Sequence, residues 1–239
     1  RSKLIHPFVA ILPSAGVGRR FKSDKPKQYS LIDNKTVMEL SLEPLLDFSE
    51  CLGICIPISH EDSYWQSIKA LQNPKINFIE GGQTRTISVQ KAVNYWKNSS
   101  IDYQNILIHD SARPCVRSSD IRAMLEDFFT GDHDGAVLGS PVSDTLKEIN
   151  PENLHVIRTA DRKDLWKVFT PQVFEREVLE TVFGKLEEGK EFTDESGMLE
   201  ESLGKIKIHL AATDNIKITH PEDLNLVKSI LTAQGRVFL

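Results

Sequence analysis

The sequence has few cysteines: only Cys51, Cys55 and Cys115 occur among its 239 residues. They are odd in number and lack the spacing of a zinc site, which favours reduced, buried thiols in a cytoplasmic protein. No apolar run approaches the ~20 residues that a membrane-spanning helix needs, and the first residues lack the pattern of a secretory signal. We therefore expect a cytoplasmic protein without a membrane partner.

Positive charge is also scarce, because 29 Lys and Arg stand against 34 Asp and Glu, for a formal net charge of -5. A general nucleic-acid binder usually carries a basic face that neutralises phosphates, so we expect no nucleic-acid partner. Residues 12–29, LPSAGVGRRFKSDKPKQY, nevertheless gather five basic residues behind one glycine turn. This local cluster predicts a small anionic ligand.

The glycine turn lacks both common nucleotide-binding signatures. A dinucleotide-binding turn reads G-x-G-x-x-G, but Phe21 stands at the third glycine position, and no Gly-Lys-Ser/Thr of a Walker loop follows. Taken alone, GVGRRF is equally consistent with an ordinary strand-to-helix turn that carries solvated arginines. The next residues favour a ligand site, because Pro26 fixes the backbone directly before Lys27 and so presents this lysine from a stiffened loop.

Short apolar runs alternate with helical patterns along the chain. Five continuous apolar runs are predicted strands, namely residues 8–12, 52–58, 76–79, 105–109 and 135–142. Residues 84–96 carry an apolar stripe of helical spacing, and residues 118–129 have a serine cap, an acidic first turn and a second stripe. This alternation predicts a doubly wound, Rossmann-like α/β fold with a mostly parallel twisted sheet covered on both faces.

The stretch from about 140 to 172 is polar and interrupts the alternation. It has turn signals around 150–153 and two weak strand patterns that pair as a hairpin. Such a hairpin is marginally stable alone, so an arm over about 141–165 is expected to lean on another surface, such as a second subunit. A Thr-x-x-Glu capping box with Pro221 in the first turn predicts a closing helix. We expect one domain over 1–239 with this arm.

Seven motifs, spread in order over nearly the whole chain, resemble one enzyme family. They are PSAGVGRRF…KPKQY at 13–29, GGQTRTISV at 81–89, HDSARP at 109–114, SPVSDTLK at 140–147, ADRKDLWKVFTPQ at 160–172, TDES at 193–196 and TDNIKITHPEDL at 213–224. Their order and spacing resemble the 2-C-methyl-D-erythritol 4-phosphate cytidylyltransferases of the non-mevalonate isoprenoid pathway. The resemblance implies a nucleotidyltransferase that moves CMP from CTP to this polyol phosphate, giving 4-diphosphocytidyl-2-C-methyl-D-erythritol and pyrophosphate. It further implies Mg²⁺ or another divalent cation as cofactor, and a homodimer.

The resemblance implies the catalytic residues Arg20, Lys27, Arg162 and Lys217. An anionic phosphate must attack the α-phosphorus of a more anionic triphosphate, so catalysis requires positioning and fixed positive charge rather than a covalent intermediate. Arg20 and Lys27 would flank the five-coordinate phosphorus, and the backbone amides from Ser14 to Gly18 would cradle the triphosphate. Family support is lacking for the other three cations of the cluster, Arg19, Lys22 and Lys25, which are expected to face solvent.

Nucleotide binding is implied for two glycine segments and one serine. The set is Pro13, Ser14, Ala15, Gly16, Gly18, Gly81, Gly82, Arg85, Ser88 and Ser111. Gly81 and Gly82 would let the backbone approach a flat base, Ser88 would bond cytosine or ribose, and the small residues would exclude a purine. Thr84 and Ile87 stand where the family often has acidic residues, so the chain departs from the family pattern there.

Substrate binding is implied for Asp110, Arg113, Thr145, Arg162, Thr170 and Lys217, and metal binding for Asp110 and Asp214. A strand that ends at His109 brings Asp110 to the edge of the glycine loop, where it would hold Mg²⁺ and bind substrate hydroxyls; otherwise it caps the turn. His109 is expected to pack or to make a hydrogen bond rather than to bind metal. Arg113 pairs either with substrate phosphate or with a neighbouring carboxylate.

The remaining implied residues lie on the arm and near the C-terminus. Asp214 and Lys217 would begin a late strand, with Lys217 at the substrate phosphate and Asp214 as a second metal contact; otherwise they form a charged strand edge. Thr145, Arg162 and Thr170 would reach the phosphate site of a neighbouring subunit, where the planar fork of Arg162 suits two oxygens.

Two other functions stay open at this point. A ribitol 5-phosphate cytidylyltransferase acts on a polyol phosphate without the branched methyl group, and motifs for CTP do not separate it, although the PSAGxGRR and ADRxxLW forms favour methylerythritol. A non-catalytic regulatory module that binds nucleotide is the second. The presence of Arg20, Lys27, Asp110, Arg162 and Lys217 together argues against it, because binding alone does not require them.

Overall fold

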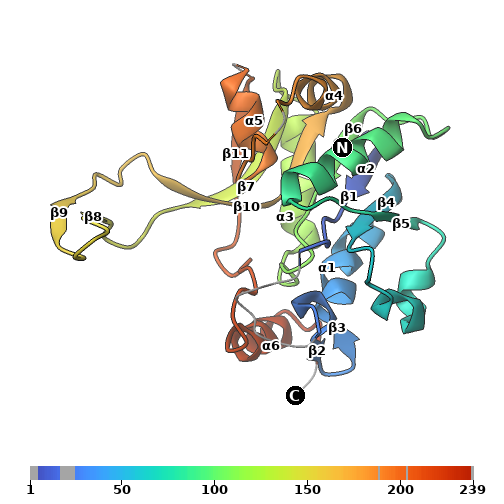
Figure 1. The fold of residues 1–239 in the computed structure, drawn as a ribbon, viewed down its shortest axis with the longest axis horizontal. Helices are drawn as coiled ribbons and strands as arrows, with labels where there is room; N and C mark the ends of the chain where they lie inside the picture. The colour runs from blue at the N-terminus through green and yellow to red at the C-terminus, as the bar shows by residue number, and fades with distance from the viewer. Residues whose placement is uncertain (1–4, 17–24, 188, 203, 238–239) are drawn as a thin grey trace.

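The computed structural model describes residues 5–16, 25–187, 189–202 and 204–237 (Figure 1). A seven-stranded sheet in the order β11-β7-β10-β6-β1-β4-β5 forms its centre. The strands are β1 (Phe8–Ile11), β4 (Cys51–Ile58), β5 (Ile76–Glu80), β6 (Asn105–Ile108), β7 (Gly135–Pro141), β10 (Trp166–Glu175) and β11 (Ile206–Leu210). Only β10 runs antiparallel to its two neighbours, so the sheet is mixed but mostly parallel.

In the described ranges, six α-helices cover the sheet and one end of it. They are α1 (Val37–Leu46), α2 (Arg85–Lys97), α3 (Ser118–Phe128), α4 (Arg176–Gly184), α5 (Glu195–Glu201) and α6 (Asp223–Ala233), with short 3-10 turns at Lys27–Tyr29, Tyr64–Ser67 and Lys69–Gln72. Within the described part of the chain, no helix is long and apolar enough to cross a membrane.

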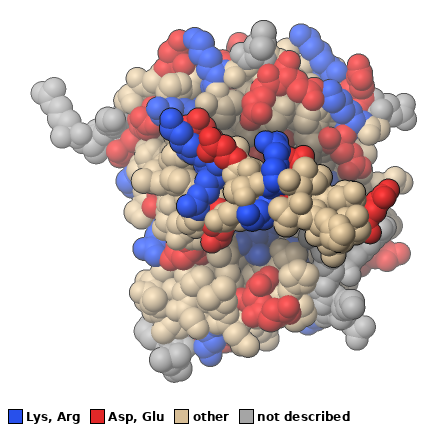
Figure 2. Space-filling model, turned by 90° about the vertical axis from the view of Figure 1, so that its left-hand side faces the viewer, with Lys and Arg blue, Asp and Glu red and all other residues tan. Residues whose placement is uncertain are grey.

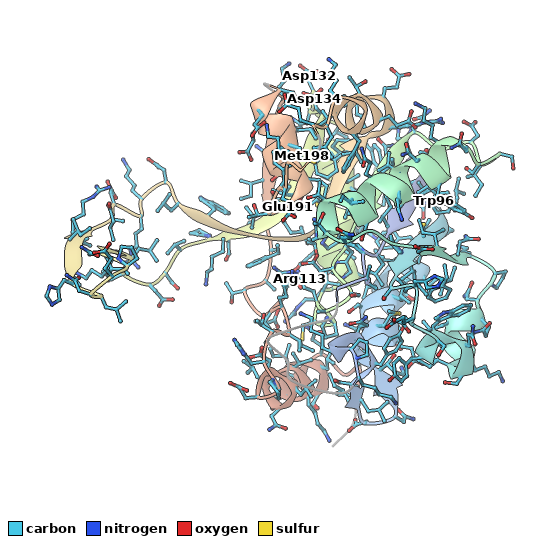
Figure 3. The ribbon with its side chains drawn as sticks, in the orientation of Figure 1. Trp96, Arg113, Asp132, Asp134, Glu191 and Met198 are labelled. Carbon is cyan, nitrogen blue, oxygen red and sulfur yellow. The ribbon has the colours of Figure 1, made fainter. Side chains whose placement is uncertain are left out.

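The two faces of the sheet bury alternate residues of the same strands. Phe8 and Ala10 of β1 belong to a core formed with α1 and α3, whereas Val9 and Ile11 belong to a core formed with α2, α4 and α5. A strand that is buried on both faces reads as a continuous apolar run, which explains why the sequence predicts it. In the second core Trp96 of α2 lies against the sheet (Figure 3) and donates a hydrogen bond to Ala10 O at 3.0 Å. The predicted doubly wound fold is confirmed.

A third core holds α6 against one end of the molecule. Val227 and Leu231 of α6 are fully buried against Val37 and Leu40 of α1, next to a small hairpin formed by β2 (Leu31–Ile32) and β3 (Lys35–Thr36). Figure 1 shows α6 and this hairpin side by side at the bottom. The packing positions the chain that precedes α6, which runs beside the candidate site.

Three local predictions are wrong. Residues 213–219 form no strand, because their backbone bonds lead to turns and to a single contact from Ile218 N to Ala112 O. The capping box of Thr219 and Glu222 does not form, since the carboxylate of Asp223 accepts the N–H groups of Thr219 and His220 instead.

The third concerns α3, whose predicted serine cap is absent. Arg117 occupies the N-cap position without a side-chain capping bond to α3, and the Ser118 hydroxyl donates to Asp47 at 3.1 Å. At α6 the carboxylate of Asp223, and at α3 that of Asp47, accepts the hydrogen bonds near the helix start. The spacing of the cap motifs does not predict these acceptors.

The polar stretch between β7 and β10 forms an arm that projects from the body (Figure 1). Its strands β8 (Lys147–Ile149) and β9 (Val156–Thr159) pair antiparallel with each other, and every residue in them is exposed. Figure 2 looks onto the arm and shows basic and acidic side chains interspersed over it. β10 continues from the arm into the sheet: it is exposed up to Val168 and buried from Phe169, and its register with β7 shifts between Phe169 and Gln172.

Candidate active site

A cavity of about 170 Å³ opens beyond the carboxyl ends of β1, β5 and β6, which is the usual ligand position in an open α/β sheet. The segments after these strands and the start of α2 meet there. The lining residues are Pro13, Ser14, Ala15, Gly16, Lys27, Gln28, Gly82, Gln83, Thr84, Arg85, Ser88, Asp110, Ser111, Ala112 and Lys217. Most of the nucleotide-binding residues predicted from the sequence are therefore neighbours in space.

Asp110 follows β6 and is the buried carboxylate of this cavity. Lys217 Nζ lies 2.9 Å from its Oδ2, Arg113 Nε lies 3.3 Å from the same atom, and Arg85 Nη2 lies 3.4 Å from its Oδ1. Burial favours the protonated acid, but the three cations outweigh it and hold the pKa of the Asp110 carboxyl well below its ordinary value. The group is therefore ionised at neutral pH, and the alternative role as a turn cap does not describe its contacts.

Arg85, the first residue of α2, lies between two buried carboxylates. Its Nη1 and Nη2 donate to Oε1 and Oε2 of Glu195 at 2.5 and 3.1 Å, while Asp110 lies on its other side. Burial disfavours the charged guanidinium, but these carboxylates raise the pKa of Arg85 above its ordinary value. Glu195 is only 2% exposed and does not line the cavity, and its side chain meets the site at Arg85.

His109 makes hydrogen bonds with its neighbours, as the sequence predicts. Its Nδ1 lies 2.9 Å from Thr170 Oγ1 and its Nε2 lies 3.2 Å from Arg113 O. Because the carbonyl Arg113 O can only accept, Nε2 of the neutral ring carries the imidazole proton, and Nδ1 accepts the hydroxyl proton of Thr170. Complete burial lowers the pKa of His109 to about 4, so the ring is neutral at physiological pH.

Thr170 lies in the body of its own subunit rather than on the arm. It is 4% exposed, its hydroxyl fixes the Asp110 turn, and its carbonyl accepts Asn215 Nδ2 at 2.9 Å. β10 already belongs to the sheet at this residue, so the structure shows Thr170 beside Asp110 of its own chain, and its reach to a neighbouring subunit stays a prediction. Of the two partners open to Arg113, the structure shows the neighbouring carboxylate (Figure 3 labels this arginine).

The loop after β1 is fixed by bonds that the motif does not reveal. Gln28 is buried and donates to Ser14 O at 2.9 Å, and Ser14 N donates to Pro57 O at 2.8 Å. The Ser14 amide is therefore used inside the protein, and the prediction that it faces the triphosphate is wrong. Gly16 has open space around its Cα. Gly18 and Arg20 lie outside the described residues.

Lys27 reaches the cavity from the 3-10 turn after Pro26. Its Nζ donates to Ile218 O at 2.7 Å, and both Lys27 and Lys217 line the cavity with Asp110. The segment 217–218 therefore brings Lys217 to the cavity wall that holds Lys27 and Asp110, and it supplies the carbonyl of Ile218 that fixes Lys27. Two fixed ammonium groups beside a buried carboxylate are the arrangement that an anionic, metal-bound ligand requires.

The second glycine segment packs tightly against protein atoms. A Cβ on Gly81 would lie 2.5 Å from Ala15 Cβ, and a Cβ on Gly82 would lie 2.2 Å from Ile87 Cγ2. The Ser88 hydroxyl accepts Gly82 N at 2.9 Å and donates to Thr84 O at 2.8 Å, so toward a ligand it has only acceptor capacity left. These glycines hold the loop close to β1 and α2. Thr84 caps α2 by accepting Ile87 N.

The two carboxylates predicted to bind metal differ in their surroundings. Asp110 lines the cavity, and Mg²⁺ is commonly held by one or two carboxylates together with substrate phosphates, so Asp110 fits this donor set. Asp214 Oδ2 pairs with Arg117 Nη2, and Asp214 does not line the cavity. The described residues contain no group of three or more His, Cys, Asp or Glu that would hold a metal without substrate.

Two predicted residues lie far from this cavity in the fold. Thr145 and Arg162 are exposed on the arm, and the Arg162 side chain makes no hydrogen bond or ion pair with the described residues. Sequence reasoning missed Gln28 and Glu195, although both stand inside quoted motifs. The sequence signal in each case is a polar residue next to apolar or ligand-binding residues within a loop motif. Such a residue often makes the hydrogen bonds that orient the ligand-binding side chain or loop.

Comparisons with known proteins agree with these observations. The family model described as 2-C-methyl-D-erythritol 4-phosphate cytidylyltransferase matches residues 8–233. A protein of that name from Vibrio parahaemolyticus is 36% identical over 234 residues, 98% of this chain and 99% of that protein. A crystal structure of 4-diphosphocytidyl-2C-methyl-D-erythritol synthase has a TM-score of 0.78 at 29% identity, over 95% and 99% of the two chains. A Francisella tularensis 2-C-methyl-D-erythritol 4-phosphate cytidylyltransferase has a TM-score of 0.76 at 28% identity, over 94% and 100%.

Proposed function

The chain belongs to the 2-C-methyl-D-erythritol 4-phosphate cytidylyltransferase family, and we propose that the cavity around Asp110 is where it transfers CMP from CTP to this polyol phosphate. The observation that carries the assignment of the site is the wall shared by Lys27, Lys217 and Asp110. It combines fixed cations with an ionised carboxylate at the carboxyl edge of the sheet.

The reaction needs little covalent chemistry from the protein. A phosphate oxygen of the polyol phosphate forms a bond to the α-phosphorus of CTP, the bond from this phosphorus to the bridging oxygen breaks, and pyrophosphate leaves with that electron pair. Negative charge increases on the phosphorus oxygens and on the leaving group during the step. Lys27 Nζ, anchored on Ile218 O, would stabilise this charge without having to reorganise. Arg20 would add a second cation.

The other wall of the cavity would bind the nucleotide. The loop 13–16 and Gly82 present backbone groups and small side chains, which suits a pyrimidine rather than a purine, and α2 begins beside them. Asp110 would hold Mg²⁺ together with triphosphate oxygens, and the bound ion would supply neutralising charge for the departing pyrophosphate. Lys217 and Arg113 pair with Asp110 in the structure. When Mg²⁺ binds Asp110, these two cations would turn to the phosphate of the polyol.

The arm would complete the site of a second copy of the chain. Leu154, Val156 and Ile157 are 73%, 58% and 61% exposed, which leaves an apolar surface on a hairpin without a core of its own. A twofold partner that covers this surface would receive Arg162 and Thr145 near its phosphate site. A symmetric dimer would thus contain two sites, each made by the cavity of one subunit and the arm of the other.

One assay tests the function and its nearest alternative. We would measure pyrophosphate release with Mg²⁺ while crossing CTP and UTP against 2-C-methyl-D-erythritol 4-phosphate and ribitol 5-phosphate. The proposal expects turnover with CTP and methylerythritol phosphate that is at least about 100-fold above the other three pairs. A preference for ribitol phosphate would favour the alternative enzyme. Tight CTP binding without turnover would favour a regulatory module.

A further inference from the structure

Glu195 occupies a place that the reaction itself does not explain. It is a carboxylate at 2% exposure, it lies behind Arg85 rather than in the cavity, and both of its oxygens accept from that guanidinium. An isolated buried carboxylate costs several kcal/mol, so a chain that keeps one uses it for pairing. The pairing partner is the residue that also contacts Asp110.

Arg85 has two carboxylates within reach but unequal contacts with them. Its contacts with Glu195 are 2.5 and 3.1 Å, whereas its contacts with Asp110 are 3.4 Å from both Nε and Nη2. A guanidinium prefers to face one carboxylate with two parallel bonds. Glu195 takes this two-point pairing, and Asp110 receives only the weaker contacts.

The backbone around Glu195 is fixed from two sides, so its carboxylate has little freedom to follow a moving arginine. Asp194 caps α5 by accepting Gly197 N at 3.1 Å, and Gln172 of β10 donates to Asp194 Oδ2 at 2.8 Å. On the other side, Phe192 N donates to Thr86 Oγ1 of α2 at 3.2 Å. Met198, in the same short helix, is buried in the core between α5 and the sheet (Figure 3).

We propose that Glu195 is a positioning residue, which holds Arg85 out of a two-point pairing with Asp110 and so keeps the Asp110 carboxylate available to ligands in the cavity. The inference rests on the proposed function of Asp110 as the carboxylate that binds metal and substrate. Without Glu195, the guanidinium would turn to the nearest buried carboxylate, which is Asp110. The Asp110 carboxylate would then form close ion pairs with Arg85, Lys217 and Arg113 at the same time. Because these pairs would occupy its oxygens, it would bind Mg²⁺ weakly.

The test uses Glu195→Gln, which keeps the shape of the side chain and removes its charge. We expect kcat to fall about 10- to 100-fold and the Mg²⁺ concentration for half-maximal rate to rise about 10-fold, as for partners that orient a metal ligand. The KM for CTP should change little. Glu180→Gln is the matched control, because it removes a carboxylate from the Arg176–Glu180 pair at 2.8 Å on α4, away from the cavity. It should leave kcat unchanged.

A double-mutant cycle separates positioning from simple support of the fold. If Glu195 acts through Arg85, Glu195→Gln should change kcat by less than about twofold in an Arg85→Met background. An equal loss in both backgrounds, or a loss that follows only the folded fraction measured by circular dichroism, would overturn the proposal.

A crystal structure of Glu195→Gln gives a readout that does not depend on turnover. The proposal expects the Arg85 guanidinium to have moved into a two-point contact with Asp110, and an unmoved Arg85 would contradict it. If the wild-type protein shows no turnover with any substrate pair, the proposed function fails, and this structure still decides whether Glu195 holds Arg85 in place.

Discussion

The cavity and the arm are built on opposite principles. At the cavity, buried charged groups hold one another, as in the chain Glu195–Arg85–Asp110–Lys217, and the Asp110 side chain is only 9% exposed. On the arm, all residues of β8 and β9 are exposed, and their charged pairs, such as Arg158 with Glu148, lie in solvent. Surface pairs of this kind contribute little to stability.

This difference indicates which parts of the site are complete in one chain. Buried, mutually fixed charges need no reorganisation when ligands arrive, which is the condition for strong stabilisation of a transition state. An exposed hairpin with an apolar surface gains its order from another molecule. The cavity is therefore preorganised within one chain, and in the proposed dimer the arm would supply the rest of the site to a partner.

The sharpest test of the cavity is Lys27→Ala. We expect turnover to fall about 100-fold or more, because removal of one preorganised donor to developing charge has this effect in other enzymes. The free energy of unfolding should fall by only about 1 kcal/mol for the lost bond to Ile218 O. Initial rates of pyrophosphate release and urea unfolding measure the two effects.

The control for this variant is Lys25→Ala, in the same loop. Lys25 is exposed and lies over the Tyr64 ring at 5.2 Å, away from the residues that line the cavity. Near-wild-type turnover in Lys27→Ala, or an equal loss in Lys25→Ala, would show that the cavity lysine has no special role.

The arm is tested by Leu154→Asp and Ile157→Asp. Both side chains are largely exposed in the single chain, so the fold should be unaffected, but a carboxylate in an apolar interface should raise the dimer dissociation constant about 100-fold or more. Sedimentation velocity over a range of concentrations measures this constant, and activity should fall with dilution in parallel. Glu152→Gln at the exposed tip is the control. An unchanged dimer would remove the arm from the interface.

A smaller effect concerns the pH dependence of the cavity side. Burial lowers the pKa of His109 to about 4 from 6.5, so the unfolded chain binds more protons than the folded chain between these values. The stability contributed by neutral His109 is therefore complete above pH 6.5 and is lost as the pH falls toward 4. Between pH 7 and pH 5 this group should lower the free energy of unfolding by about 2 kcal/mol.

Urea unfolding at both pH values, with His109→Gln as the comparison, measures this contribution. The variant should lose less stability than the wild type between pH 7 and pH 5. Identical losses in the two proteins would mean that His109 titrates normally and that the Asp110 turn is more accessible to water than its contacts indicate.

The sequence predicts the cavity side of the fold better than the arm side. The five predicted strands lie within a residue or two of β1, β4, β5, β6 and β7, because strands that are buried on both faces are continuous apolar runs. β10 was missed as a sheet strand, because its first three residues are exposed and its register with β7 shifts after Phe169. Its burial depends on neighbours that no local pattern contains.

The same limit applies to the site. The family resemblance predicts Lys27, Asp110 and Lys217 as site residues, and all three line one cavity. The meeting of parallel strand ends explains only why Asp110 lies beside the glycine loop. The motifs did not reveal that Glu195 holds Arg85, which lies 110 positions away in the chain, or that Gln28 fixes the loop after β1. Such supporting contacts depend on tertiary packing, and the residue type alone does not predict them.

The division of the site between two chains is tested most directly by mixing two inactive variants, Lys27→Ala and Arg162→Ala. In a mixed dimer, one site lacks both groups, while the other combines an intact cavity with an intact arm. Equal amounts, allowed to exchange subunits, should recover about a quarter of wild-type activity, because half of the dimers are mixed and each has one intact site. A mixture of Arg162→Ala with Thr145→Ala should recover none, since every site then meets a defective arm. No recovery in the first mixture, although mixed dimers form, would contradict a site shared between subunits.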